Sequence, residues 1–204
     1  ADPGLVTSPL YYSLDGGFTW QLNFDVPYGP TGPGGFPGDQ TIAFSADGGE
    51  LFGALLRADN TNLQVFRTND VTSPAVLPTF DARPKIDQPW VESRRVVGGP
   101  DDGKLRVYVG YNDDGPAFGS PTATVDVCLD GLAAAPVYTA VKLNPRPVGA
   151  GLRDGYGIRP VAHADGTVYV AYEGWTAGAF GNPITTNIVV VRDDNWGKGA
   201  TPFT

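Results

Sequence analysis

Short stretches in which apolar and polar residues alternate recur along this chain, and Gly, Asp, Asn and Pro separate them. A period of two is typical of strands that bury one face, and these stretches are rich in β-branched and aromatic residues. No stretch of helical length shows the period of about 3.6 that marks an amphipathic helix. The pattern predicts an all-β protein with strands at Gln40–Ser45, Glu50–Arg57, Leu63–Thr68, Pro89–Arg94, Lys104–Tyr111, Thr124–Leu129, Val137–Leu143, Ile158–Ala162, Thr167–Tyr172 and Asn187–Arg192.

The composition supports this prediction and limits the class of protein. The 204 residues include 28 glycines and 19 prolines, which long helices do not tolerate, while 41% hydrophobic residues suffice for a buried core. We expect a single β-architecture. No run approaches the roughly 18 apolar residues of a membrane-spanning helix. The net charge of −8 does not favour nucleic acid as a partner.

The cysteine count and the first residues of the chain indicate in which cellular compartment the protein acts. Cys128 is the only cysteine, so no disulfide within the chain and no cysteine-based zinc site is expected. It lies in an alternating run, where a small buried hydrophobic residue is the expected role. The chain has no methionine and begins Ala1-Asp2-Pro3, which suits either signal-peptide cleavage or the scar of a fusion. The first interpretation predicts a secreted or extracytoplasmic protein.

Two landmarks recur with a common spacing. Turns that each precede a predicted strand stand at Asp47-Gly48, Asp102-Gly103 and Asp165-Gly166. They lie 55 and 63 residues apart, and Asp-Gly between apolar runs is a strong hairpin signal. A second set of aspartates, at steps of 55, 60 and 64 residues, comprises Asp15, Asp70, Asp130 and Asp194. The shared period of about 60 residues predicts repeated four-stranded units, which are typical of the blades of a β-propeller.

The first of these aspartates lies in the most specific motif of the chain. The pattern Ser-x-Asp-x-Gly-x-Thr-Trp is matched by Ser13, Asp15, Gly17, Thr19 and Trp20. It resembles the Asp box, or BNR repeat, of the sialidase superfamily, in which the boxes lie on the outer rim of a propeller and are structural. We expect the Ser hydroxyl and Asp carboxylate to hydrogen-bond backbone groups across the turn, and Trp20 to be buried between neighbouring units.

The landmarks divide the chain into blades. We expect the last two strands of one blade within residues 1–30, complete blades within 39–80 and 87–143, and a blade without its outermost strand within 156–204. The chain thus accounts for about three to four blades, whereas propellers close with about four to eight. The resemblance to sialidases implies six. We therefore expect either a fragment of a ring or a ring completed by a second chain or an oligomer.

Polar residues begin the predicted innermost strands, over which propellers bind their ligands. These strands begin with Asp39-Gln40, Asp87-Gln88 and Gly157-Ile158-Arg159. Asp39 and Asp87 would place two carboxylates near one face, joined by Arg83, Tyr156 and Arg159. Such a cluster suits a polar sugar or a calcium ion, the one cofactor that the sequence suggests. The alternative is that both aspartates cap their own turns.

The resemblance implies hydrolysis of glycosidic bonds. Sialidases bind the substrate carboxylate with a cluster of arginines, which suit bidentate contacts, and use an Asp acid/base and a Tyr nucleophile assisted by Glu. Here Tyr172-Glu173 or Tyr156 suits the Tyr/Glu part, and Trp90 is either a sugar platform or part of the core. No residue is assigned as catalytic. The substrate-binding candidates are Arg83, Asp87, Trp90, Tyr156, Arg159, Tyr172 and Glu173.

Together these patterns predict a secreted, sialidase-like propeller that acts on carbohydrate, with exo-sialidase-type hydrolysis as the implied activity. The alternative is a non-catalytic propeller that binds glycans or proteins. Two further motifs are interpreted as structural. His163 precedes a turn, and the run Asn112-Asp113-Asp114-Gly115 is predicted to be a solvated turn, because it lacks the distal Glu of an EF-hand loop.

Overall fold

The structure is a computed structural model that describes residues 7–27, 38–56, 62–73, 77–114, 122–143, 154–155, 157–178 and 182–203. Within these ranges the chain forms thirteen strands and no helix, which confirms the all-β prediction. In that part of the chain there is accordingly no helix with the length and apolar character needed to cross a membrane.

Two of the sheets are four-stranded antiparallel meanders, in which consecutive strands are neighbours. The first consists of β3 (Gln40–Phe44), β4 (Leu51–Leu56), β5 (Leu63–Thr68) and β6 (Leu77–Ala82). The second consists of β7 (Ile86–Arg95), β8 (Leu105–Asp113), β9 (Thr122–Cys128) and β10 (Tyr138–Lys142). Antiparallel neighbours need only tight turns between them, which the frequent Asp-Gly sequences supply.

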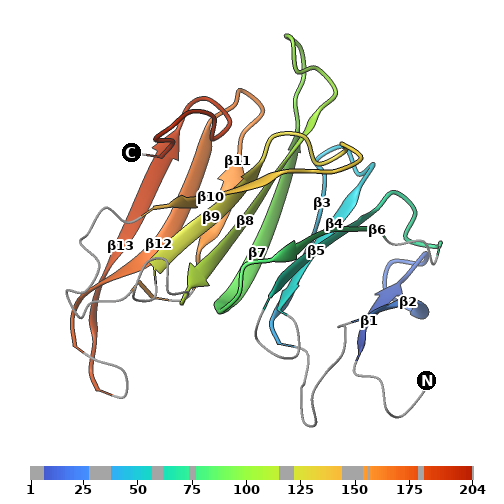
Figure 1. Cartoon of the computed structure of the whole chain (residues 1–204). Helices are drawn as coiled ribbons and strands as arrows, with labels where there is room; N and C mark the ends of the chain where they lie inside the picture. The colour runs from blue at the N-terminus through green and yellow to red at the C-terminus, as the bar shows by residue number, and fades with distance from the viewer. Residues whose placement is uncertain are drawn as a thin grey trace.

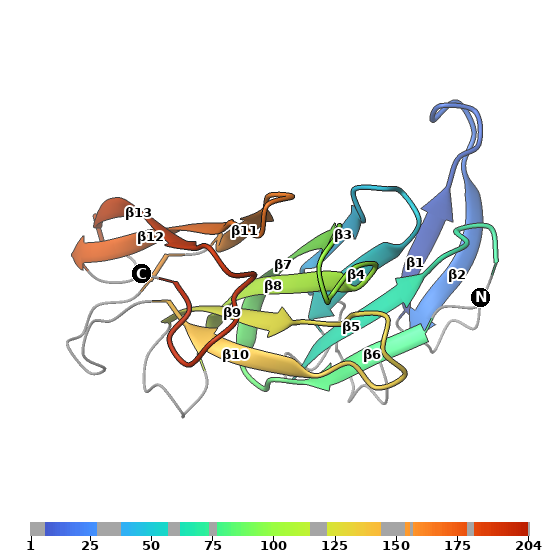
Figure 2. The same cartoon turned by 90° about the horizontal axis from the view of Figure 1, so that it is seen from above.

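Two smaller sheets flank the meanders. One pairs β1 (Thr7–Tyr12) with β2 (Gln21–Pro27), and the other orders β11 (Arg159–Ala162), β12 (Val168–Ala177) and β13 (Thr185–Asp193). The four sheets stand side by side from the N-terminal to the C-terminal end (Figure 1). The first strands β3, β7 and β11 lie toward one side of this array, and the last strands β6 and β10 toward the other (Figure 2). The described strands do not close into a ring.

Hydrophobic side chains fill the spaces between neighbouring sheets. One cluster, which includes Phe52 and Val91, joins the β3–β6 sheet to the β7–β10 sheet, and another, which includes Tyr108 and Val170, joins the latter to the β11–β13 sheet. The middle sheet is thus covered on both faces, and every residue of β8 is buried. Glycine at Gly110 permits a close approach, because a Cβ there would lie 2.7 Å from the Ile158 carbonyl oxygen. This contact holds the start of β11 beside β8.

The turn between β1 and β2 is held by its own side chains. Asp15 Oδ1 accepts from the Thr19 amide at 2.9 Å, and Asp15 Oδ2 accepts from the Thr19 hydroxyl at 2.6 Å. The Ser13 hydroxyl donates to Asp15 Oδ1 at 2.8 Å and accepts from the Gly17 amide at 2.8 Å. The Thr19 hydroxyl is the largest of the causes that lower the pKa of Asp15 to about 2. These hydrogen bonds close the turn without help from other sheets.

The prediction of a buried Trp20 is wrong. Its side chain is 63% exposed, and its indole Nε1 donates to the Gly17 carbonyl oxygen at 3.1 Å. The turn between β1 and β2 projects beyond the other described sheets (Figure 2). The Trp20 indole therefore stabilises its own turn and does not belong to a core between two sheets.

Candidate carboxylate site

Asp39 and Asp87 lie where two neighbouring inner strands begin. Asp39 directly precedes β3, Asp87 is the second residue of β7, and the two strands are in contact. The two carboxyl groups are close enough for their negative charges to interact. Burial raises the pKa of Asp87, and the negative charges of Asp39 and Asp114 raise it further. The structure thus brings the two aspartates of the repeated Asp-Gln sequence into one acid pair.

The backbone beside Asp87 adopts a conformation that residues with side chains rarely take. Gln88, Lys85 and Arg83 have φ angles of +49°, +60° and +70°. The Gln88 amide donates to Asp87 Oδ1 at 2.9 Å, so Asp87 also caps its own turn. Left-handed residues other than glycine cost about 1–3 kcal/mol each and cluster at functional sites. The strain therefore marks the segment that leads into the acid pair.

An arginine lies on an aromatic ring farther along β7. The guanidinium carbon of Arg159 is 4.1 Å from the centroid of the Trp90 ring, which is 40% exposed. Partial burial lowers the pKa of Arg159, and no acid among the described residues opposes this shift. The β7–β8 ladder has a bulge between Asp87 and Trp90, which places both side chains on one face. The aromatic ring thus lies on the same strand as Asp87, and the guanidinium, which has no ion-pair partner among the described residues, lies at the start of the contacting strand β11.

Arg83 does not join this group. Its Nε donates to both carboxylate oxygens of Asp126 at 3.1 Å, and its Nη2 donates to Asp126 Oδ1 at 2.9 Å and to the Tyr138 carbonyl at 3.0 Å. Asp126 is completely buried on β9 and also accepts from the Tyr111 hydroxyl at 3.2 Å. Arg83 therefore pairs with a buried residue of β9, the third strand of its sheet, and not with residues of the inner strands.

The candidate Tyr/Glu pair is divided between two faces. Tyr172 and Glu173 are adjacent on β12, and adjacent residues of a strand point to opposite sides. Tyr172 is buried in the core between the sheets, whereas Glu173 is half-buried. Gly155 packs against Glu173, because a Cβ on this glycine would lie 2.7 Å from the Glu173 Cβ. Tyr156, the other tyrosine candidate, lies outside the described residues.

Asn112 belongs to the site although its sequence context predicts a solvated turn. That prediction is wrong, because β8 continues through Asp113 and places Asn112 directly opposite Asp87 in the ladder. Asn112 is completely buried, and neither its Oδ1 nor its Nδ2 has a hydrogen-bond partner in the described structure. A strand covered on both faces loses the alternation that identifies strands in a sequence. The sequence feature that could have placed Asn112 in a strand is its position directly after the predicted strand Lys104–Tyr111.

The pair offers few ligands for calcium. Within the described ranges, no group of three or more His, Cys, Asp or Glu side chains is placed to hold a metal ion. Asp39 and Asp87 supply two carboxyl groups, whereas calcium takes about six to eight oxygen ligands. Two carboxyl groups alone do not complete such a set of ligands, and calcium at the pair stays a prediction.

The fold is similar to that of known glycosidases. Two structures of an α-L-arabinofuranosidase from Fusarium graminearum with an iminosugar inhibitor, one of them a mutant, match with a TM-score of 0.61 at 14% identity. The matches cover 96% of this chain but only 57% and 56% of the enzyme, so the chain spans less than two thirds of its length. An exo-β-1,3-galactanase from Clostridium thermocellum matches with a TM-score of 0.47 at 17% identity, over 93% of this chain and 40% of the enzyme. No protein-family profile and no curated protein sequence matches the chain.

At this identity the likeness to the arabinofuranosidase concerns the fold alone. The chain shares an all-β fold with this enzyme. A six-bladed ring of the sialidase type stays a prediction.

Proposed function

We propose that this chain carries the acid pair of a carbohydrate-acting glycoside hydrolase. The observation that carries the proposal is that Asp39 and Asp87 lie at the starts of two contacting inner strands, where their negative charges interact. Most glycoside hydrolases use two carboxyl groups, of which one is held protonated to act as an acid. The raised pKa of Asp87 suits the acid, and Asp39 supplies the second carboxyl group. The shared fold with an arabinofuranosidase supports this choice.

In the proposed reaction Asp87 gives its proton to the glycosidic oxygen as the bond to the leaving sugar breaks. Asp39 attacks the anomeric carbon, and water then hydrolyses the resulting ester with Asp87 as the base. An inverting enzyme needs about 6.5–9.5 Å between its carboxyl groups for the attacking water, whereas a retaining enzyme needs about 5–5.5 Å. Direct attack by Asp39 predicts retention of configuration.

Turnover of a panel of chromogenic glycosides tests this function. The panel should contain sialosides, uronides and neutral furanosides and pyranosides, so that the class of sugar is not assumed. We expect release of the chromophore from at least one of them, with the anomeric configuration retained in the first product seen by NMR. Saturable binding of a glycan without any turnover would instead establish the non-catalytic alternative.

We propose that the substrate is an acidic sugar, as a sialidase type of activity requires. Arg159 supports this choice, because its guanidinium is exposed, stacks on Trp90 and has no ion-pair partner among the described residues. A planar guanidinium suits bidentate contact with a carboxylate, and an aromatic ring suits the apolar face of a sugar. Secretion would expose such a site to extracellular glycans, and it remains part of the proposal.

Replacing Arg159 with alanine should weaken binding of a carboxylate-bearing sugar by about 10-fold to 100-fold, because a charge-assisted contact is lost. Arg159→Lys should restore only part of the affinity, since a lysine lacks the planar fork. Arg192→Ala is the matched control, because Arg192 is exposed but already paired with Asp194. Calorimetry with N-acetylneuraminic acid and a neutral hexose measures the effect. Equal weakening for both sugars would remove carboxylate recognition from the role of Arg159.

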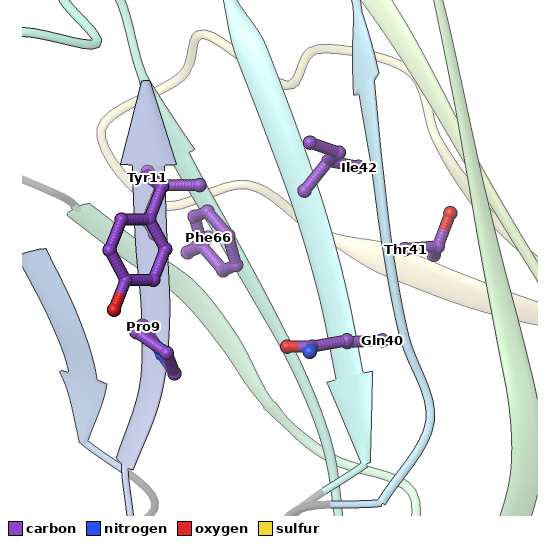
Figure 3. A pocket seen from close by; sticks show the side chains of 7 residues that line it. Pro9, Tyr11, Gln40, Thr41, Ile42 and Phe66 are labelled. Carbon is purple, nitrogen blue, oxygen red and sulfur yellow. The ribbon is translucent and has the colours of Figure 1, made fainter. Parts of the chain in front are cut away.

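Exposed apolar side chains on β1, β3 and β13 support completion of the ring. Ile42, Phe44 and Tyr11 are 57%, 55% and 51% exposed, and Ile188 on β13 is 72% exposed. A groove of about 240 Å³ separates β1 from β3, and its lining is formed by Pro9, Leu10, Tyr11, Gln40, Thr41, Ile42 and Phe66 (Figure 3).

We propose that strands of another chain or of a second copy cover these surfaces, since apolar patches of this kind mark interaction sites. Light scattering should then give a mass above the 21.5 kDa of one chain. A stable monomer at every concentration, without binding of an apolar dye, would contradict completion.

A further inference from the structure

The residue opposite Asp87 has polar atoms that nothing in the described structure satisfies. Asn112 is 0% exposed, and its Oδ1 and Nδ2 lack hydrogen-bond partners. Residues directly opposite in an antiparallel ladder point to the same face, with Cβ atoms about 4.5–5.5 Å apart. The carboxamide of Asn112 and the carboxyl group of Asp87 are therefore within reach of each other through rotation of their side chains. A buried amide without a partner is costly, so a conformation that pairs it is favoured.

The charged groups around Asp87 determine whether the nitrogen or the oxygen of the Asn112 amide pairs with its carboxyl group. Asp39 faces it from the start of β3 and Asp114 from the end of β8, and both add negative charge. The Gln88 amide donates to Asp87 Oδ1, which leaves Oδ2 for other partners. Because the pKa of Asp87 is raised by these neighbouring charges, the site as a whole is negatively charged, which attracts a donor rather than an acceptor. The amide nitrogen of Asn112 is thus the end that suits Asp87.

We propose that Asn112 is the positioning residue of the acid pair, with its Nδ2 donating to Asp87 when Asp39 turns toward the sugar. Asp39 lies close enough to Asp87 for its charge to raise the pKa of Asp87, and an anomeric carbon must enter between the two carboxyl groups. Asn112 then gives Asp87 a second partner behind the pair and keeps its carboxyl group in place for proton transfer. The role of Asn112 in hydrolysis rests on the proposed function, whereas its contact with Asp87 does not.

The test follows the Asp87 carboxyl carbon by NMR in protein labelled with ¹³C-aspartate. In Asp39→Asn protein, where Asp87 titrates alone, addition of Asn112→Leu should raise the pKa of Asp87 by about one to two units, because a donor to the carboxylate is lost. Gln64→Leu is the matched control. Gln64 is likewise a buried amide with an unpaired oxygen, but it lies on β5 and should leave the titration unchanged.

An unchanged or lowered pKa in folded Asn112→Leu protein would overturn the proposal. Where this variant does not fold, Asn112→Ser replaces it, and the same upward shift is expected because the serine side chain is too short to reach Asp87. These titrations need no substrate, so they stand even if no glycoside is hydrolysed. Where turnover is found, Asn112→Leu should lower kcat by about 10-fold or more, leave KM within a few-fold, and move the alkaline limb of the pH profile upward.

Discussion

Replacing Arg83 with alanine should lower the free energy of unfolding by about 3–5 kcal/mol, the largest stability effect that we expect from a single substitution. The carboxylate of Asp126 is completely buried and accepts three hydrogen bonds from the Arg83 side chain. Without them the Tyr111 hydroxyl remains the one side-chain donor to Asp126 among the described residues, and burial already raises the pKa of Asp126. Urea unfolding at neutral pH measures the loss.

Two comparisons separate this effect from a general loss of charge. Arg192→Ala removes an exposed ion pair with Asp194 and should cost less than about 1 kcal/mol. The double variant Arg83→Met with Asp126→Leu removes both charges and should recover most of the stability. Normal stability of Arg83→Ala together with a loss of sugar binding would return Arg83 to the substrate-binding residues.

Replacing Asp87 with asparagine should reduce glycoside turnover by about 10²-fold to 10⁴-fold while sugar binding stays within a few-fold, because the amide cannot donate the catalytic proton. The fold of Asp87→Asn protein should be at least as stable as the wild type at pH 7. The pKa of Asp87 is raised above 3.8, so the folded state binds more protons than the unfolded chain above that value. The contribution of Asp87 to the stability of the fold therefore falls as the pH rises from 3.8 through its raised pKa. The uncharged asparagine side chain avoids this loss of stability.

Asp114→Asn is the matched control for this substitution. Asp114 adds to the pKa shift of Asp87 through its charge, but it is exposed at the end of β8. We expect Asp114→Asn protein to keep turnover within a few-fold and to move the alkaline limb of the pH profile downward. Unaltered turnover in both Asp87→Asn and Asp39→Asn proteins would exclude the acid pair as the catalytic site.

Much of the fold follows from local patterns in the sequence. The alternating stretches and Asp-Gly turns predict strands joined by hairpins, as in the β3–β4 pair, because register and turn chemistry are local properties. The repeated Asp-Gln likewise predicts that Asp39 and Asp87 lie close together, since equivalent positions of neighbouring blades share one face.

The remaining features of the site depend on contacts between distant parts of the chain. The sequence leaves open that Arg83 reaches Asp126, because the left-handed backbone at Arg83 redirects its side chain. The burial of Tyr172 depends on how tightly the third sheet packs on the second. Asn112 escapes sequence analysis for a similar reason, since a polar residue next to two aspartates is usually solvated. Only the ladder shows that it faces Asp87.

The most direct test of the proposed site is a crystal structure of the protein with a cationic iminosugar, which mimics the charge that develops at the anomeric carbon. The account predicts that the ring nitrogen lies within hydrogen-bonding distance of Asp39 or Asp87, and that the sugar ring lies against Trp90 and Arg159. The groove of about 700 Å³ between β10 and β13, which Val189 and Phe203 help to line, is the competing location. An iminosugar bound there, with the acid pair untouched, would contradict the account.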